Sequence, residues 1–167
     1  SHPTFEVTST IGKDNNSSEE LFKIDVTNPA ALTVTSALEV GASAEGLQVD
    51  VAGAYAAVGT RHEDKEFFVV NLGAFTEAFS GDTYGGSQAE SVSLFGSHGY
   101  IGSTSDIQDV SILRVAPGGW ADATLVGSAD LSGNHDESVL WVEGNYAYLA
   151  NENNGTNHDF FVYDIST

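Results

Sequence analysis

Apolar residues in this chain gather in short runs that recur at a nearly constant period. The runs are rich in aromatic and β-branched residues and lie at 21–26, 67–72, 110–115 and 160–165. Asp25, Asn71, Arg114 and Asp164 occupy the same position in the four runs, spaced 46, 43 and 50 residues apart. Such runs predict strands, and a β-rich repeat of this period is typical of a β-propeller blade.

Two further strand patterns precede the later copies of this run. Related cassettes open the repeats at 44–47 (Ala-Glu-Gly-Leu), 89–92 (Ala-Glu-Ser-Val) and 136–139 (Asp-Glu-Ser-Val). A small-residue and tyrosine strand follows each cassette. This alignment places Glu45, Glu90 and Glu137 at one position, at the mouth of the innermost strand of each blade.

The repeats predict an all-β, β-propeller-like array of about four repeats of four-stranded antiparallel blades, with incomplete blades at both ends. The predicted strands number three, four, four and three. The chain is interpreted as one domain, 1–167, with repeats at about 1–42, 43–86, 87–133 and 134–167, or as a segment of a larger propeller. An incomplete sheet leaves unpaired backbone groups that attract another strand. The expected partners are therefore other proteins, or copies of the chain itself, at the open strand edges.

The net charge of the chain argues against some classes of binding partner. The chain has 24 Asp and Glu against 5 Lys and Arg, a net charge of −19, and no cysteine. So strong a negative field repels nucleic-acid phosphates and anionic bilayers, and no apolar run is long enough to span a membrane. We expect no nucleic acid, no direct membrane insertion, and an extracellular or cell-surface location, although this composition also suits a cytosolic domain.

The predicted topology gathers acidic residues on one face, because the loops between second and third strands emerge beside the connections between blades. Glu20, Glu66 and Asp109 belong to these loops. The predicted interaction face consists of Asp14, Glu63, Asp64, Asp136, Glu152 and the turn residue Trp120, which is expected to be an exposed contact aromatic.

Carboxylates that converge on the propeller axis predict a metal site. Glu45, Glu90 and Glu137 could supply oxygen ligands to calcium, the cofactor that suits an irregular set of carboxylates. The alternative is structural, with each carboxylate accepting backbone N–H groups. His62, His135 and His158 are each followed by an acid and offer a second metal hypothesis, against solvated surface histidines.

No catalytic motif is present, so the chain is predicted not to be an enzyme, with no catalytic residues. The leading interpretation is a non-enzymatic module for protein interaction, adhesion or filament assembly. The alternatives are a calcium-dependent propeller hydrolase or lyase that acts through carboxylates of the acidic face, and a structural cation-binding module.

The segments 143–150, 160–166 and 21–30 (Leu-Phe-Lys-Ile-Asp-Val-Thr-Asn-Pro-Ala) resemble the LVIVD-repeat family of β-propellers. The resemblance implies a secreted or cell-surface bacterial or archaeal module, found also in pilin-like proteins, without shared catalytic residues. The middle copies depart from the family pattern at Asn71 and Arg114. The Asp25 side chain is expected to cap the following turn.

Overall fold

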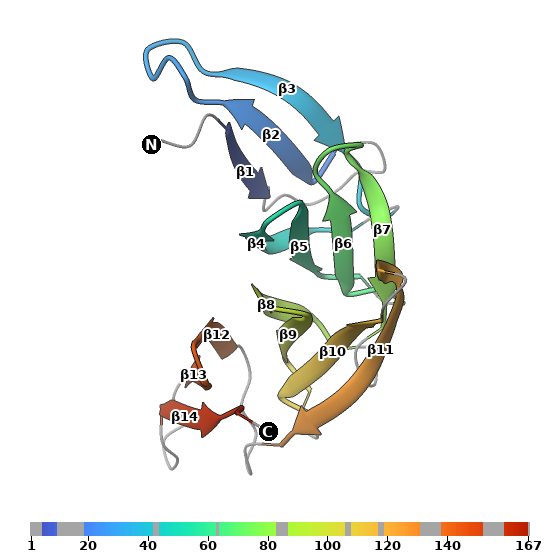
Figure 1. The fold of residues 1–167 in the computed structure, drawn as a ribbon, viewed down its shortest axis with the longest axis vertical. Coiled ribbons are helices and arrows are strands. Elements are labelled where there is room, and N and C mark those ends of the chain that lie inside the picture. Colours follow the sequence, from blue (N-terminus) through green and yellow to red (C-terminus); the bar gives the residue numbers. More distant parts are fainter. Residues whose placement is uncertain are drawn as a thin grey trace.

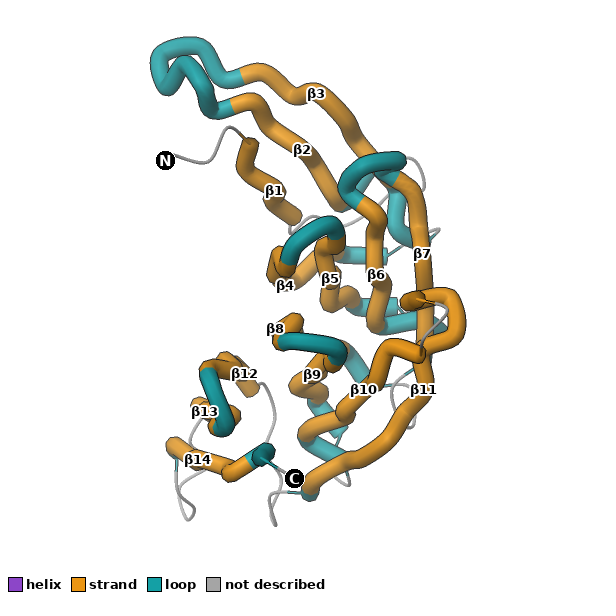
Figure 2. The backbone as a smooth tube through the Cα atoms, viewed as in Figure 1, coloured by secondary structure: helices purple, strands orange, loops and turns teal. Residues whose placement is uncertain are grey.

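The computed structural model of the chain describes residues 5–9, 19–41, 44–62, 64–82, 87–105, 108–116, 119–130, 138–151 and 159–166. Strands and loops make up all of these residues (Figure 2). The part of the chain that is described includes no helix long and apolar enough to cross a membrane. The predicted all-β class is confirmed.

The strands form four antiparallel sheets in which neighbours in the sheet are neighbours in the chain. The first sheet contains β1 (Phe5–Ser9), β2 (Leu21–Asp25) and β3 (Thr33–Leu38). The second contains β4 (Gly46–Ala52), β5 (Tyr55–Thr60), β6 (Phe67–Asn71) and β7 (Thr76–Gly81). The third contains β8 (Ala89–Phe95), β9 (His98–Ser103), β10 (Val110–Ala116) and β11 (Gly119–Ala129). The fourth contains β12 (Ser138–Glu143), β13 (Tyr146–Asn151) and β14 (Phe160–Asp164), so the predicted distribution of three, four, four and three strands is confirmed.

The four sheets follow one another along an open arc (Figure 1). The strands β4, β8 and β12 lie on the concave side with β1, and β3, β7 and β11 lie on the convex side. Neighbouring sheets touch along the concave side, where β8 contacts β4, β5 and β12. The first and fourth sheets lie at opposite ends of the arc.

Glycine fixes the tight turn that joins the first two strands of a blade. Gly53, Gly96 and Gly144 all have φ near +60°, and each stands first in a two-residue hairpin loop. A left-handed backbone at this position matches the twist of the two strands and favours glycine. The three turns therefore mark equivalent points in the second, third and fourth sheets.

A second recurring device closes the turn after the third strand. The side-chain oxygen of Asp25 accepts hydrogen bonds from the N–H and hydroxyl of Thr27, at 2.9 and 2.7 Å. Asn71 and Asp164 likewise accept backbone N–H groups two residues ahead, each at 2.9 Å. The predicted cap at Asp25 is confirmed, whereas the third sheet has Arg114 at this position.

Among the described residues, the hydrophobic core consists of three clusters, one at each junction between neighbouring sheets. Because side chains alternate along a strand, the third strand of a blade serves two junctions at once. In β6, Phe68 and Val70 belong to the cluster shared with the first sheet, and Phe67 and Val69 belong to the cluster shared with the third. All four are fully buried. The second sheet is therefore stabilised by a neighbour on both sides.

We predict that Gly59→Ala destabilises the chain because β5 passes too close to β8 for a side chain. A Cβ at Gly59 would lie against the carbonyl oxygen of Ala89, well inside van der Waals contact. The matched control is Gly127→Ala, whose Cβ would lie 3.6 Å from the Ile112 side chain, an ordinary contact. Thermal unfolding should show a loss of about 1–3 kcal/mol for the first variant and less than about 0.5 kcal/mol for the second. Equal melting temperatures would contradict the close approach.

We also predict a pH-dependent contribution from the cap at Asp25. Its hydrogen bonds from the Thr27 hydroxyl and N–H lower the pKa of the Asp25 carboxyl group. A lowered pKa in the folded state stabilises the fold above the ordinary carboxyl pKa, and this contribution is lost as the pH falls through the lowered value. Asp25→Ala should therefore melt below the wild type at pH 7 but not in acid, whereas Asp25→Asn keeps an acceptor and should reduce the loss at pH 7. A difference between wild type and Asp25→Ala that persists at pH 2 would count against this explanation.

Candidate functional site

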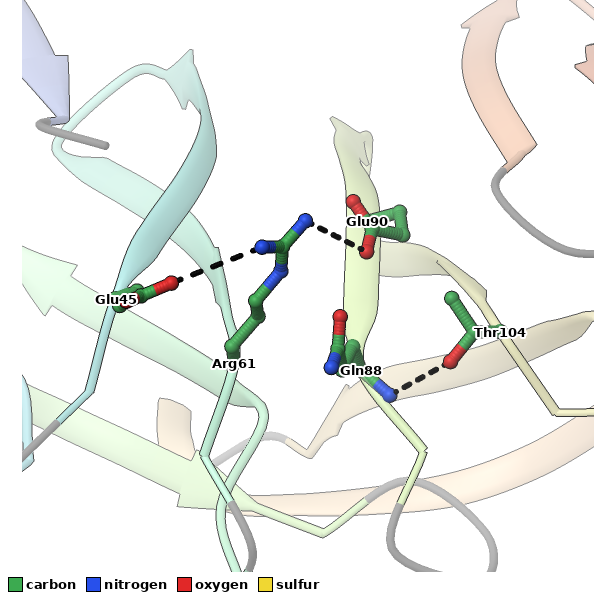
Figure 3. A network of polar contacts seen from close by, with 5 residues as sticks. All are labelled: Glu45, Arg61, Gln88, Glu90 and Thr104. Atoms are coloured by element: carbon green, nitrogen blue, oxygen red, sulfur yellow. Dashed lines mark hydrogen bonds and ion pairs between the residues drawn. The ribbon is translucent and has the colours of Figure 1, made fainter. Parts of the chain in front are cut away.

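Two of the three predicted axial glutamates lie close together and share one arginine (Figure 3). The guanidinium of Arg61 lies 3.8 Å from a carboxylate oxygen of Glu45 and 3.7 Å from one of Glu90. Glu45 precedes β4 and Glu90 lies in β8, so the arginine joins two neighbouring sheets on their concave side. All three side chains are partly exposed.

The two glutamates are not at equivalent positions, contrary to the alignment of the cassettes. In the second sheet the N–H of Arg61 donates to the carbonyl of Glu45 at 3.0 Å, and in the third sheet Thr104 donates to Gln88 at 3.1 Å. Gln88 is therefore the counterpart of Glu45. Glu90 is the extra residue of a β-bulge between Ala89 and Ser91. The second sheet has the same bulge at Leu47, so Leu47 is the counterpart of Glu90 and the cassette alignment is two residues out of register.

The guanidinium of Arg61 lies between the carboxylates of Glu45 and Glu90, where a calcium ion was expected. Glu137 lies outside the described residues, so the third predicted ligand cannot be placed. Within the described ranges, no three His, Cys, Asp or Glu side chains are grouped closely enough to hold a metal ion. The calcium site and the calcium-dependent enzyme stay predictions that nothing here tests.

The predicted interaction face is described only in part. Asp14, Glu63, Asp136 and Glu152 lie outside the described residues. Asp64 is exposed, as the prediction requires.

The histidine hypothesis is likewise only partly placed, because His135 and His158 lie outside the described residues. The Nδ1 atom of His62 accepts hydrogen bonds from the N–H groups of Asp64 and Lys65, at 3.0 and 3.2 Å. The ring of His62 thus closes a local turn, which accounts for a histidine in this loop.

Some acids expected on this face are in fact buried. Glu20, Glu66 and Asp109 each stand immediately before a third strand and are almost fully buried. Glu20 accepts the N–H of Val40 at 2.9 Å, which ties the loop after β3 back to β2. The acidic face is therefore less extensive than the count of acids suggests.

The expectation that Trp120 is an exposed contact aromatic is wrong. Trp120 lies in β11 rather than in a turn, is 6% exposed and belongs to the core between the second and third sheets. Its ring meets Tyr55 edge to face with centroids 6.3 Å apart. It also passes close to Gly99, where an added Cβ would lie 3.2 Å from the indole. Absence of a side chain at Gly99 makes room for the ring, a contact between distant residues that local sequence does not reveal.

A groove of about 550 Å³ lies between the hairpin turns of the third and fourth sheets, at the end of the strands away from Glu45. His98, Tyr100, Asn145, Asp164 and Ser166 are among its lining residues. Burial raises the pKa of the Tyr100 hydroxyl, and hydrogen bonds from Ser166 lower the pKa of Asp164. The groove was not anticipated, because its residues come from separate repeats.

The fourth sheet has one buried and one exposed apolar face. Leu140, Val142 and Leu149 pack against the third sheet. The opposite face, called here the terminal face, is formed by Val139, Trp141, Tyr148, Phe160 and Val162.

The terminal face is continuous across the three strands. Val139, Trp141, Phe160 and Val162 are 63%, 57%, 60% and 51% exposed, respectively. Tyr148 pairs with Trp141 on one side and with Val162 on the other, and it stacks on Phe160 with ring centroids 6.4 Å apart. Contiguous exposed apolar surface of this kind marks an interaction site.

Comparisons with known proteins place the last repeat and the fold. Residues 136–167 match the model of the LVIVD repeat, which covers β12 to β14 and confirms the resemblance there. No curated protein matches the chain.

Solved structures with similar folds include two computationally designed proteins and one β-propeller domain. The computationally designed Ika4 protein has a TM-score of 0.64 at 13% identity, with 99% of this chain and 94% of that chain covered. The computationally designed Ika8 protein has 0.63 at 14%, with 99% and 48% covered. The β-propeller domain of Cps50 (Swd1) from Myceliophteria thermophila has 0.60 at 14%, with 86% and 48% covered. These likenesses show the fold, and the chain spans about half the length of the last two.

We predict that Arg61→Ala lowers stability by about 1 kcal/mol, which for a chain of this size is a fall of about 2–4 °C in Tm. The substitution removes two ion pairs and leaves Glu45 and Glu90 without the charge between them. Salt screens this repulsion, so the loss should shrink in 1 M sodium chloride. Arg114→Ala is the matched control, since it removes the same charge from an exposed strand position. Indistinguishable melting curves for the two variants at low salt would refute a specific role for Arg61.

Proposed function

We propose that this chain, which carries an LVIVD repeat in a β-propeller-like fold, is a non-enzymatic module for protein interaction at the cell surface or outside the cell. The terminal face is the surface through which it binds. The proposed function is assembly or adhesion rather than catalysis of a chemical reaction.

The observation that carries the proposal is the contrast between the terminal face and its counterparts within the arc. Phe160 and Val162 correspond in register to Phe67 and Val69, which are fully buried against the next sheet. The same kind of apolar side chains is therefore uncovered in the fourth sheet and covered in the second. Burial of large apolar side chains stabilises an interface by roughly 1.5–3 kcal/mol for each residue. A protein partner that covers this face would gain that stabilisation.

The charge of the chain supports an extracellular or cell-surface setting. A net charge of −19 keeps the molecule soluble despite the exposed apolar face, and salt outside the cell would screen it. Strong like charge also suppresses nonspecific association, so a partner must offer either apolar complementarity or basic groups. The acidic side chains thus favour selective contacts.

The proposal predicts that binding depends on the terminal face. The native chain, immobilised at low density, should retain surface proteins or copies of the chain, and Trp141→Ser/Val162→Ser should retain at least tenfold less. Both residues are more than half exposed, so the substitutions should leave the fold intact. Quantitative recovery of bound protein measures the difference.

The control is Leu125→Ser/Val126→Ser, which removes two exposed apolar residues from β11 at the convex side. It should bind as the native chain does. Equal retention by all three proteins would show that the terminal face is not the binding surface. Turnover of a substrate that survives the terminal-face substitutions would instead favour an enzyme.

A further inference from the structure

We infer that the partner of the terminal face is a second copy of this chain, bound head to tail, so that the fourth sheet of one copy packs on the outer face of the first sheet of the other. Two such contacts in a pair of chains would close one propeller. The inference rests on the proposed function, in that the terminal face must bind protein. It adds the identity of that protein and the surface that meets it.

The first sheet carries the surface that the terminal face requires. In the register shared by the third strands, Phe22 and Ile24 of β2 correspond to Phe68 and Val70 of β6. The β6 pair is fully buried against the preceding sheet. Phe22 and Ile24 are only half-buried, and no other sheet among the described residues covers them. They form, with neighbouring Val34, an apolar surface that is called here the leading face.

The leading face and the terminal face correspond to surfaces that already pack on each other at the internal junctions of the chain. The leading and terminal faces occupy the two positions that meet at each internal junction: the front of one sheet and the back of the sheet before it. Packing a fourth sheet on a first sheet would therefore repeat the geometry of the three existing junctions. Such a head-to-tail contact closes into a ring where the rotation between units allows it.

The concave side supplies a more specific observation. At the junction between the second and third sheets, the side chain of Gln48 accepts the N–H of Val92 at 2.9 Å, and Asp50 accepts that of Leu94 at 2.7 Å. The innermost strand of one sheet thus provides acceptors for the exposed backbone of the next innermost strand. These two hydrogen bonds belong to the junction between the second and third sheets, since Ser91 and Ser93 occupy the corresponding positions of β8.

The corresponding positions in β12 are Val139 and Trp141, as the hairpin glycines and the strand pairing align them. Their side chains are apolar, so a sheet packed on the terminal face would be held by side-chain burial rather than by acceptors of this kind. In the described residues the first sheet has no strand beyond β1 on its concave side.

The arc of this chain corresponds to about half of two longer chains with the same fold. The chain spans 48% of the Ika8 chain and 48% of the Cps50 (Swd1) propeller domain chain, both of which share its fold. The arc of four sheets leaves room at both ends for a second arc of the same kind (Figure 1).

Charge sets the conditions under which the pair should form. Each copy carries −19, so repulsion opposes association at low ionic strength. The Debye length falls from about 10 Å at 0.1 M salt to about 3 Å at 1 M, while apolar contacts are kept. The affinity should therefore rise with salt, the reverse of an association driven by opposite charges.

Sedimentation equilibrium of the 167-residue chain over a concentration series tests the inference. The native chain should form a dimer that is at least tenfold tighter in 1 M than in 0.1 M sodium chloride. Trp141→Glu alters the terminal face and Ile24→Glu alters the leading face, and each alone should weaken the dimer at least tenfold. Leu125→Glu adds the same charge outside both faces and should dimerise as the native chain does.

Mixing the two variants distinguishes head-to-tail pairing from other arrangements. Trp141→Glu retains an intact leading face and Ile24→Glu retains an intact terminal face, so an equimolar mixture can form one native contact. It should give a one-to-one dimer that is tighter than either variant forms alone. If the terminal face instead paired with itself, Ile24→Glu would dimerise normally and mixing would restore nothing, which would overturn the inference.

Two measurements keep the test decisive. Circular dichroism and thermal melting establish that each variant is folded, and Ile24→Thr replaces Ile24→Glu if the latter unfolds. A native chain that remains monomeric at concentrations on the order of 0.1 mM in 1 M salt overturns the pairing. In that case retention of a different protein through Trp141 and Val162 would leave the proposed function standing, whereas loss of both would reject the two proposals together.

Discussion

Burial between sheets is the interaction on which the rest of this structure depends. A single three- or four-stranded sheet in this chain is apolar on both faces, so neither face is stable until another sheet covers it. Strand β6 illustrates the constraint, because Phe67 and Phe68 are neighbours in sequence but belong to different clusters. A shift of one residue in the register of β6 would exchange the two sets and disrupt both junctions.

The junction between the second and third sheets is not uniform from the concave to the convex side. Near the concave side, contacts are polar and close: Gln48 and Asp50 bind the backbone of β8, Arg61 joins two carboxylates, and Gly59 lets β5 approach Ala89. Toward the convex side, aromatic and aliphatic side chains provide the apolar area that is buried between the sheets. The polar contacts fix the register between sheets, and the apolar contacts provide most of the stabilisation.

The sequence predicted those features that depend on local pattern. Alternating apolar residues located the third strands and aligned Asp25, Asn71, Arg114 and Asp164, which the strand pairing confirms. It also predicted the number of strands and the cap at Asp25. It could not locate the bulge at Glu90, because a bulge depends on pairing with another strand.

Features of the candidate site that depend on contacts between repeats were out of reach for the same reason. Trp120 follows a turn-like sequence, yet its ring is buried because Gly99, on a different strand, leaves space for it. Glu66 and Asp109 look like surface acids in sequence but are buried at the start of third strands. The terminal face had a signal that comparison of the repeats could have found: Val139 and Trp141 stand where β8 has Ser91 and Ser93.

The difference between β8 and β12 shows that equivalent positions in two repeats can have different roles. Ser91 and Ser93 are small and almost fully buried, which lets β12 approach β8 closely on the concave side. Val139 and Trp141 are larger, apolar and exposed, so a sheet packed on them would be held by side-chain burial rather than by polar contacts to its backbone. Internal junctions need a fixed register because they form within one chain, whereas a junction with a separate protein needs enough buried apolar area to offset the loss of translational and rotational freedom. The last repeat thus has exposed valine and tryptophan at positions where the third sheet has buried serines.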